Sequence, residues 1–287
     1  MANGKDLQRV FVVGSYVQAC CWYVARLPEA GESILATDFR VDAGGKGLNV
    51  AVGLARLECE VSLLVGCGDD PAGDELLALL EREGMAATDV IRLPAHSGIG
   101  SGHVGPTGEN QIVVFPGANA LVNAAHVLAA APRMDRAHVV YAQFEAAPDA
   151  IREAFRIASH AGVTTVLNPS PWREPGAELR ATTQVLIVNG LEAEALLCDL
   201  QEDPGELLAQ LGSDRWPSVL KRLTSHWPGL LQLQVTLGER AGLGFRERRS
   251  VTTGPRWSVS SRAARRWTRW ARETLFRQPM WPPSRKG

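Results

Sequence analysis

The sequence predicts an α/β fold, a doubly wound and mostly parallel sheet that carries a small β-sheet lid. Along most of its 287 residues, short apolar runs typical of buried strands alternate with helix-like segments. Such alternation favours a parallel sheet covered by helices on both faces. Two other stretches alternate polar and apolar residues instead, which is typical of antiparallel strands.

Hydrophobic periodicity assigns the core elements in order. The predicted strands are Val10–Val13, Glu60–Gly66, Val139–Ala142, Thr164–Leu167, Val185–Val188 and Gln232–Leu237. The predicted helices are Gly47–Leu57, Asp74–Arg82, Asp149–Ala161 and Leu191–Leu197. The first helix follows a glycine-rich turn and places Leu48, Val52 and Ala55 at helical spacing. The second is rich in leucine, with acidic residues near its start, where the helix dipole favours negative charge.

The two stretches that break this rhythm are Trp22–Val41 and Gly98–Phe115. Each contains turn sequences, such as Pro28-Glu29-Ala30-Gly31 and Pro106-Thr107-Gly108. We interpret them as antiparallel strands or hairpins that form a lid. The expected domain is therefore an α/β core over residues 1–240, with lid segments near 16–43 and 97–116.

Cysteine usage and hydropathy favour a cytoplasmic protein. The five cysteines are Cys20, Cys21, Cys59, Cys67 and Cys198. Their odd number and the lack of a Cys-x-x-Cys spacing indicate reduced thiols rather than disulfides or a zinc site. No apolar run is long enough to cross a bilayer, and the polar first residues do not resemble a signal peptide. We therefore expect no membrane partner.

The net charge of −1 conceals an internal break. Residues 241–287 hold eleven Arg and one Lys against two Glu, a net charge of +10, so the remaining residues carry −11. One interpretation is a basic arm for nucleic acid or membrane. The other is that this tail does not belong to the fold, because it lacks a periodic apolar pattern. No nucleic-acid-binding motif accompanies the charge, so we expect no nucleic-acid partner.

The local motif with the clearest chemistry is Gly44-Gly45-Lys46-Gly47-Leu48-Asn49, between a predicted strand and a predicted helix. Glycines allow the backbone to approach a ligand closely, and free amides at a helix start bind polar or anionic groups. The Gly-x-x-x-x-Gly-Lys-Ser/Thr spacing of a P-loop is absent. Alone, the motif fits an ordinary turn as well as a ligand loop.

Seven further motifs accompany it. They are Val13-Gly14-Ser15, Pro28-Glu29-Ala30-Gly31-Glu32, Gly68-Asp69-Asp70 with Gly73, Phe115-Pro116-Gly117-Ala118-Asn119, Asn168-Pro169-Ser170-Pro171, Asn189-Gly190-Leu191-Glu192 and Thr236-Leu237-Gly238. From about Val10 to Arg240, their order and spacing resemble those of the ribokinase-like (PfkB-type) carbohydrate kinase family, with a pattern closest to ribokinase. The resemblance implies an ATP-dependent sugar kinase that uses Mg²⁺.

The resemblance also implies roles for individual residues. Gly44, Gly45, Lys46, Asn49 and Glu145 would bind the sugar.

At the nucleotide, Asn189, Thr236 and Gly238 would contact ATP, and Glu192 would organise the magnesium ion and the phosphates. Magnesium prefers oxygen ligands and is usually held by one or two carboxylates together with water.

The chain departs from the family pattern at the sugar. The family usually has an Asp five residues after the glycine of the first strand, where this chain has Ala19. A missing acceptor for a substrate hydroxyl weakens that contact, so we expect an Asp at position 19 to tighten sugar binding.

A second departure concerns catalysis. The family's Gly-Ala-Gly-Asp motif, whose amides stabilise phosphoryl charge and whose Asp acts as base, is absent. Its place is near Arg272, Glu273 and Thr274. If each codon up to Glu273 ends in G, a shift of two bases respells residues 266–274 as Val-Asp-Ala-Val-Gly-Ala-Gly-Asp. We therefore interpret residues 241–287 as a frameshifted tail that does not complete the fold, and expect the chain as written to have little or no kinase activity.

The leading functional hypothesis is an ATP-dependent sugar kinase, with ribose as the first candidate and a nucleoside, fructose or another ketose behind it. The alternatives are a nucleoside kinase of the same family and a non-catalytic sugar-binding protein on a kinase fold. We further expect a homodimer formed through the lid.

Overall fold

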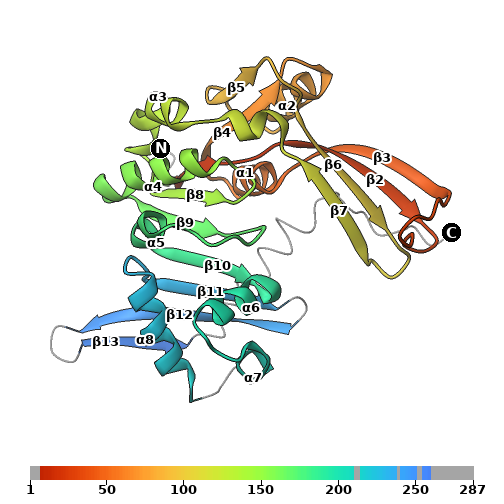
Figure 1. Cartoon of the computed structure of the whole chain (residues 1–287). Helices are drawn as coiled ribbons and strands as arrows, with labels where there is room; N and C mark the ends of the chain where they lie inside the picture. The colour runs from red at the N-terminus through yellow and green to blue at the C-terminus, as the bar shows by residue number, and fades with distance from the viewer. Residues whose placement is uncertain (1–6, 210–213, 238–239, 251–253, 260–287) are drawn as a thin grey trace, which may run out of the picture.

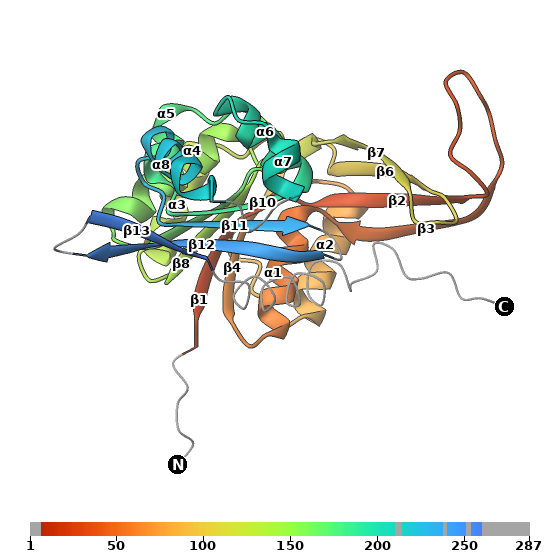
Figure 2. The same ribbon diagram turned by 90° about the horizontal axis from the view of Figure 1, so that it is seen from below.

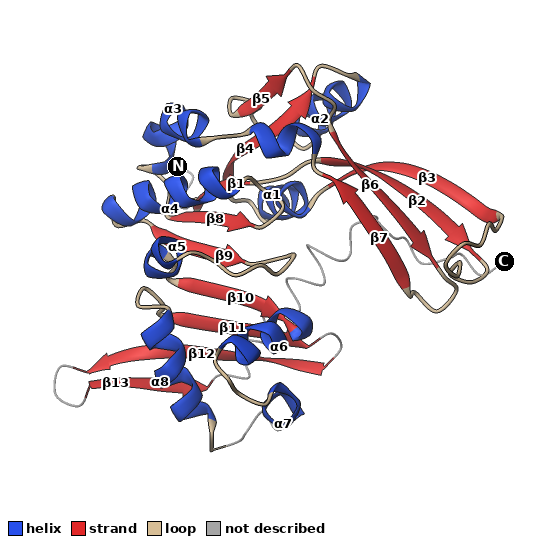
Figure 3. Ribbon diagram, viewed as in Figure 1, coloured by secondary structure: helices blue, strands red, loops and turns tan. Residues whose placement is uncertain are grey.

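The computed structural model describes residues 7–209, 214–237, 240–250 and 254–259 (Figure 1). Within these residues the chain forms a nine-stranded sheet with helices on both faces and a separate four-stranded sheet that projects from one side (Figure 3). This arrangement is the α/β fold with a small second sheet that the sequence predicts.

The large sheet has the order β13-β12-β11-β10-β9-β8-β1-β4-β5. Its strands are β1 (Arg9–Val13), β4 (Glu60–Gly68), β5 (Val90–Leu93), β8 (Val139–Gln143), β9 (Thr164–Asn168), β10 (Val185–Asn189), β11 (Gln232–Leu237), β12 (Arg240–Ser250) and β13 (Gly254–Val259). In this order, every neighbouring pair from β11 through β1 to β5 is parallel. The pairs β11/β12 and β12/β13 are antiparallel. The chain leaves β1 first toward β4 and later toward β8. The strand order therefore reverses at β1, the position in an open α/β sheet where ligands bind.

Helices cover the two faces of this sheet unequally (Figure 2). On one face lie α1 (Lys46–Arg56) and α2 (Pro71–Arg82). On the other lie α3 (Ala124–Met134), α4 (Pro148–His160), α5 (Ala177–Thr182), α6 (Gly190–Asp199), α7 (Pro204–Ala209) and α8 (Trp216–His226). Strand β1 serves both cores because its side chains alternate: Val10 and Val12 pack with α1 and α2, whereas Phe11 and Val13 pack with the larger group.

Every core strand and helix predicted from periodicity is present, with ends that shift by a few residues. The largest shift is at α2, which begins at Pro71 rather than Asp74 because the Asp70 side chain caps it by accepting from the Gly73 amide at 2.8 Å. The sequence reasoning missed β5, α3, α5, α7 and α8. Among these, α3 contains Pro132, a residue that normally argues against a helix interior.

The small sheet has the order β3-β2-β6-β7, formed by β2 (Val17–Val24), β3 (Ala36–Gly44), β6 (Gly98–Val104) and β7 (Asn110–Phe115). The β2/β3 and β6/β7 pairs are antiparallel, as predicted. The two hairpins join through β2 and β6, which pair in parallel, a junction on which the sequence analysis made no prediction. The short 3-10 helix η1 (Gly117–Leu121) follows β7, and its buried Asn119 holds the root of the sheet by accepting from the Tyr16 amide at 2.8 Å and donating to the Tyr16 carbonyl at 2.6 Å.

The large sheet continues beyond residue 240, where the sequence places the end of the core. Strand β12 pairs with β11 from Gln232↔Arg246 to Leu237↔Arg240, and β13 pairs with β12. Phe245 is completely buried, and its ring centroid lies 4.7 Å from that of Trp216 in α8. The described residues of the predicted tail, 241–250 and 254–259, thus extend this sheet, whereas the interpretation of residues 241–287 as an aberrant tail stays a prediction. The predicted lost motif near Arg272, Glu273 and Thr274 lies outside the described residues, and the frameshift stays a prediction.

Replacing Phe245 by Ala tests whether β12 belongs to the stable fold. Because the ring is buried against α8, we expect Phe245→Ala to lower the free energy of unfolding by about 3–5 kcal/mol in chemical denaturation. The control is Leu128→Ala in α3, where the residue is 54% exposed and a loss below about 1 kcal/mol is expected. An equally small loss for both variants would mean that β12 adds nothing to the core.

The five cysteines are free thiols, and Cys21 and Cys67 are buried. In the parts of the chain that the structure describes, no helix combines the length and apolar character needed to cross a membrane.

Candidate functional site

A carboxylate and a hydroxyl meet at the point where the strand order reverses. Ser15 follows β1 and Glu145 follows β8, so both lie at the carboxyl ends of neighbouring parallel strands. The Ser15 hydroxyl donates a hydrogen bond of 2.7 Å to Glu145 Oε2, although the two residues are 130 positions apart in the chain. The side chain of Gln143, the last residue of β8, donates to Ser15 Oγ at 2.9 Å and accepts from the Glu145 amide.

The glycine-rich loop brings α1 to this carboxylate. Gly45 is the N-cap of α1 and has φ of 107°, a left-handed conformation that favours glycine. A Cβ at this position would lie 2.6 Å from the Ser15 carbonyl oxygen, so no side chain fits. The Gly45 backbone therefore approaches Ser15 closely, which brings the start of α1 next to Glu145. There the Lys46 amide donates to Glu145 Oε2 at 2.9 Å, and Lys46 Nζ lies 3.7 Å from Glu145 Oε1. The predicted residues Gly45, Lys46 and Glu145 therefore lie together.

Glu145 accepts both hydrogen bonds at Oε2, so among the described residues Oε1 has only the Lys46 ammonium nearby, and the side chain still reaches solvent because it is 15% exposed. Lys46, at 42% exposed, presents a cation beside it. A charged acceptor and a charged donor at one opening can bind the hydroxyl groups of a polar ligand from both sides. Gly44, the last residue of β3, is buried behind the loop.

Asn49, which the sequence assigns to the same pocket, occupies a different position. It lies one turn beyond Lys46 in α1 and lines a cavity of about 170 Å³ between β3, α1 and α2, together with Asp42. Within the described residues its side chain forms no hydrogen bond with Lys46 or Glu145. A sugar-binding role for Asn49 stays a prediction.

A second polar cluster lies at the carboxyl end of β10, where α6 begins. The Asn189 side chain accepts from the Glu192 amide at 2.9 Å, and Glu192 Oε2 accepts from the Asn189 amide at 2.9 Å, which together form a capping box. Glu192 also accepts from Asn189 Nδ2 at 2.9 Å and from Asn168 Nδ2 at 3.2 Å. These donors explain how its side chain is tolerated in a residue that is only 4% exposed.

Thr236 stands beside Asn189 because β10 and β11 pair these two residues directly, and its hydroxyl donates to the Val188 carbonyl at 3.3 Å. Gly238, which the sequence also assigns to the nucleotide, lies outside the described residues. The buried Tyr141 of β8 is close to both clusters: burial, followed by the negative charges of Glu145 and Glu192, raises the pKa of its phenol. The two clusters thus lie on the same side of the sheet, at the carboxyl ends of its parallel strands.

Sequence reasoning missed the residues that hold the two carboxylates in place. Ser15 and Gln143 orient Glu145, and Asn168 orients Glu192. Ser15 and Asn168 belong to motifs that the sequence analysis had singled out, so their polar side chains at strand ends were the available signal. Gln143 directly follows the predicted strand Val139–Ala142 and belonged to none of the family motifs, so it carried no such signal.

Glu192 fits magnesium as an organising carboxylate. Its two oxygens already accept three N–H groups, which leaves little room for direct coordination. Among the described residues, no three His, Cys, Asp or Glu side chains gather as a metal cage. Magnesium bound to nucleotide phosphates needs no such cage, because it keeps water ligands and takes one or two carboxylates.

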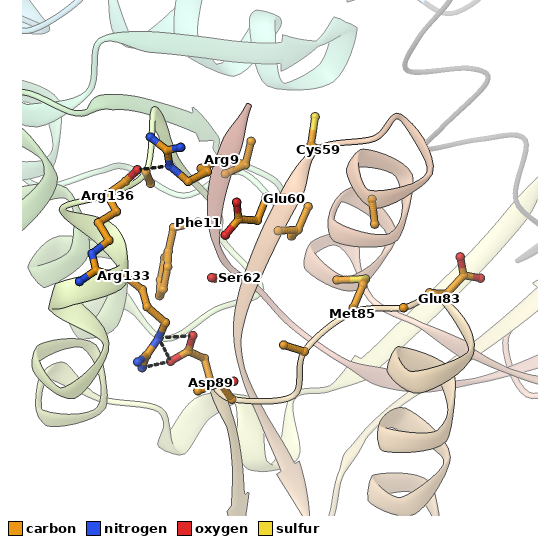
Figure 4. A pocket seen from close by; sticks show the side chains of 17 residues that line it. Arg9, Phe11, Cys59, Glu60, Ser62, Glu83, Met85, Asp89, Arg133 and Arg136 are labelled. Atoms are coloured by element: carbon orange, nitrogen blue, oxygen red, sulfur yellow. Dashed lines mark hydrogen bonds and ion pairs between the residues drawn. The ribbon is translucent and has the colours of Figure 1, made fainter. Parts of the chain in front are cut away.

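A larger cavity, of about 450 Å³, opens at the other ends of these strands, beside the first residues of β1 and β4 (Figure 4). It exists because β5 pairs with β4 only from Val65 onward and leaves the start of β4 uncovered. Arg133 closes on Asp89 with hydrogen bonds of 2.7 and 2.9 Å, and Arg9 Nε donates to the Arg136 carbonyl at 2.7 Å. No residue of the two clusters lines this cavity, so we assign it no part in the site.

Comparison with known proteins places the chain. The model of the pfkB family carbohydrate kinases matches residues 7–216. The chain is 32% identical over 202 residues to a ribokinase of Mus musculus, which covers 70% of this chain and 62% of that protein. It is 29% identical over 189 residues to a deoxyribokinase of Salmonella typhi, covering 65% of this chain and 62% of that protein.

Among solved structures, the ribokinase of Arabidopsis thaliana complexed with ribose and ATP has a TM-score of 0.69 at 21% identity. That similarity covers 88% of this chain and 78% of the other, and it shows a shared fold. The chain spans 62–66% of the length of the first curated relatives that it matches. With the family model matched over most of its length, this protein belongs to the pfkB family of carbohydrate kinases.

Proposed function

We propose that this protein is an ATP-dependent sugar kinase that moves the γ-phosphate of ATP to a hydroxyl of ribose or a related small sugar. The observation that carries the proposal is the Glu145 carboxylate, held by Ser15 and by the Lys46 amide at the point where the strand order reverses. The similarity to a ribokinase and to a deoxyribokinase supports the same class of substrate.

Each cluster has its own task in this proposal. Glu145 accepts hydrogen bonds from sugar hydroxyls, and Lys46 donates to sugar oxygens beside it. Gly44 and Gly45 give the sugar room to approach the backbone, and Asn49 adds a polar contact from the next turn of α1.

Asn189, Thr236 and Gly238 position the nucleotide, while Glu192 orients Asn189 and the magnesium hydration shell. Bound magnesium would neutralise phosphate charge. Phosphoryl transfer depends mainly on such positioning and charge stabilisation.

A second candidate is a sugar-binding protein without catalysis. It is favoured by one observation: the Gly-Ala-Gly-Asp motif is absent from the sequence as written. Without that motif the chain has neither the phosphate-binding amides nor the base that the resemblance implies. Sugar binding and phosphoryl transfer must therefore be measured separately.

We further propose a homodimer formed through the lid, in a cytoplasmic setting. Strand alternation places Trp22, Phe39 and Val113 on one face of the small sheet, and these side chains are 38%, 44% and 74% exposed. Exposed apolar surface of this kind favours association. The free state of all five cysteines supports a reducing compartment.

Calorimetric titration of the 287-residue chain with ribose, 2-deoxyribose, fructose and a nucleoside tests the proposal. We expect binding of ribose or 2-deoxyribose, and binding of ATP in the presence of magnesium. Tighter binding of the nucleoside would favour the nucleoside kinase alternative. A chain that binds ATP but none of these sugars would contradict the assignment.

A further inference from the structure

The register of the lid places a carboxylate beside Ala19. Strands β2 and β3 are antiparallel, and Ala19 lies directly opposite Asp42. Directly opposite residues project from the same face of the sheet, with Cβ atoms about 4.5–5.5 Å apart. The Asp42 side chain is therefore a direct neighbour of Ala19, the position at which the family usually has an Asp.

Asp42 has no partner of its own. Among the described residues it accepts no hydrogen bond and forms no ion pair, although it is half-buried. Asp38, on the same face of the same strand, lies 3.5 Å from the Arg40 guanidinium. A half-buried carboxylate without a donor in the protein keeps its oxygens free to accept hydrogen bonds from water or from a ligand.

Asp42 lies close in the chain to the loop of the sugar cluster, since it precedes the Gly44-Gly45 turn by two residues. It also lines the cavity of about 170 Å³ that Asn49 lines, which neither Lys46 nor Glu145 lines. On the face of the lid that carries Ala19, burial and then the negative charge of Asp42 raise the pKa of the Cys21 thiol to about 11. The carboxylate is thus on the same side of the lid as Ala19 and beside the helix that presents Lys46.

We propose that Asp42 accepts hydrogen bonds from hydroxyl groups of the sugar and so replaces the acidic residue missing at position 19. The inference rests on the proposed sugar kinase function and names a specificity-determining residue for it. The acceptor has moved to the neighbouring strand while keeping its place on the same face. The substrate must then be a sugar with a free hydroxyl on the side of the lid, and an analogue lacking that hydroxyl binds more weakly.

The test compares Asp42→Asn with Asp38→Asn by calorimetric titration of the full chain with ribose and its single-deoxy analogues. Asp42→Asn is expected to weaken ribose binding about ten-fold or more, because a hydrogen bond to a charged acceptor is lost. Asp38→Asn removes the same charge from the same face and is expected to change binding less than two-fold. For one deoxy analogue, the wild-type chain and Asp42→Asn should bind alike, a result that a merely structural role of Asp42 would not produce.

The double variant Ala19→Asp with Asp42→Asn is expected to recover most of the lost affinity. The sequence alone predicts that Ala19→Asp tightens sugar binding, but the structure reverses this expectation: Ala19→Asp alone should give no gain, since it sets two carboxylates opposite each other. The inference is overturned if the wild-type chain binds ribose and Asp42→Asn binds it equally well, or if Ala19→Asp alone tightens binding ten-fold. Should the wild-type chain bind ATP but no sugar, the proposed function itself fails. Circular dichroism of each variant separates misfolding from a lost contact with the sugar. If Asp42→Asn misfolds, the ribose affinity of the Ala19→Asp variant tests the inference instead.

Discussion

With ribose as acceptor, the 287-residue chain is expected to turn over ATP more slowly, by at least about 10²- to 10⁴-fold, than a variant whose residues after Arg240 are read in the alternative frame. Loss of a general base alone typically costs this much, and loss of anion-binding amides adds to it. The printed sequence has neither group, because residues 266–274 replace the Gly-Ala-Gly-Asp motif. Both chains keep the Glu145 and Glu192 clusters.

The measurement is steady-state ATP turnover by the two chains, with ribose affinity determined alongside. Comparable affinity with unequal turnover locates the defect in catalysis. A control variant of the frame-corrected chain replaces its restored Asp, which the alternative frame encodes across residues 273–274, by Asn and should fall to the rate of the chain as written. Equal rates for the two full chains would refute the frameshift. The nucleotide sequence of the gene around codon 240 gives an independent answer.

Glu145→Gln is expected to weaken sugar binding about 10²-fold. The substitution removes the charge that faces Lys46 Nζ at 3.7 Å and converts one oxygen into a donor, which cannot accept from sugar hydroxyls or from the Lys46 amide. Two charge-assisted hydrogen bonds, each worth about 1.5–3 kcal/mol, account for a loss of this size. Calorimetric titration with ribose checks the value.

The matched control is Glu178→Gln in α5, whose side chain is 52% exposed and lies away from the two clusters. It should bind ribose as the wild-type chain does. Binding of ATP should be unchanged in both variants, because the Asn189 cluster does not contact Glu145. Unchanged ribose affinity in Glu145→Gln would contradict the proposed role of Glu145 in binding the sugar, and with it the main support for the proposed function.

Local patterns allowed much of the fold to be predicted. The strands and helices of the core were readable because burial imposes a period of two or 3.6 residues within a single segment. Motif order then pointed to the family. Several of the missed elements are short, since β5 has four residues and α5 and α7 have six each. The helices α3 and α8, of eleven residues each, were missed as well, and α3 contains a proline.

The candidate site was only partly predictable. The glycine-rich motif indicated the loop before α1, and the spacing of Asn189 and Glu192 indicated the start of a helix. The contact between Ser15 and Glu145 joins residues 130 positions apart, and no local pattern encodes it. Gln143 was likewise invisible, since a glutamine at a strand end gains meaning only from the side chain that it holds.

By itself, then, the sequence determined the alternation of strands and helices, the family, and the absence of the Gly-Ala-Gly-Asp motif, since each is read along one continuous segment. Tertiary structure alone decided that Lys46 and Glu145 meet, that β12 extends the sheet past residue 240, and that Asp42 stands opposite Ala19. These depend on how separate segments pair. In a sheet a shift of one residue moves every side chain to the other face, so the register that sets Asp42 beside Ala19 is decided by the packing of the whole lid.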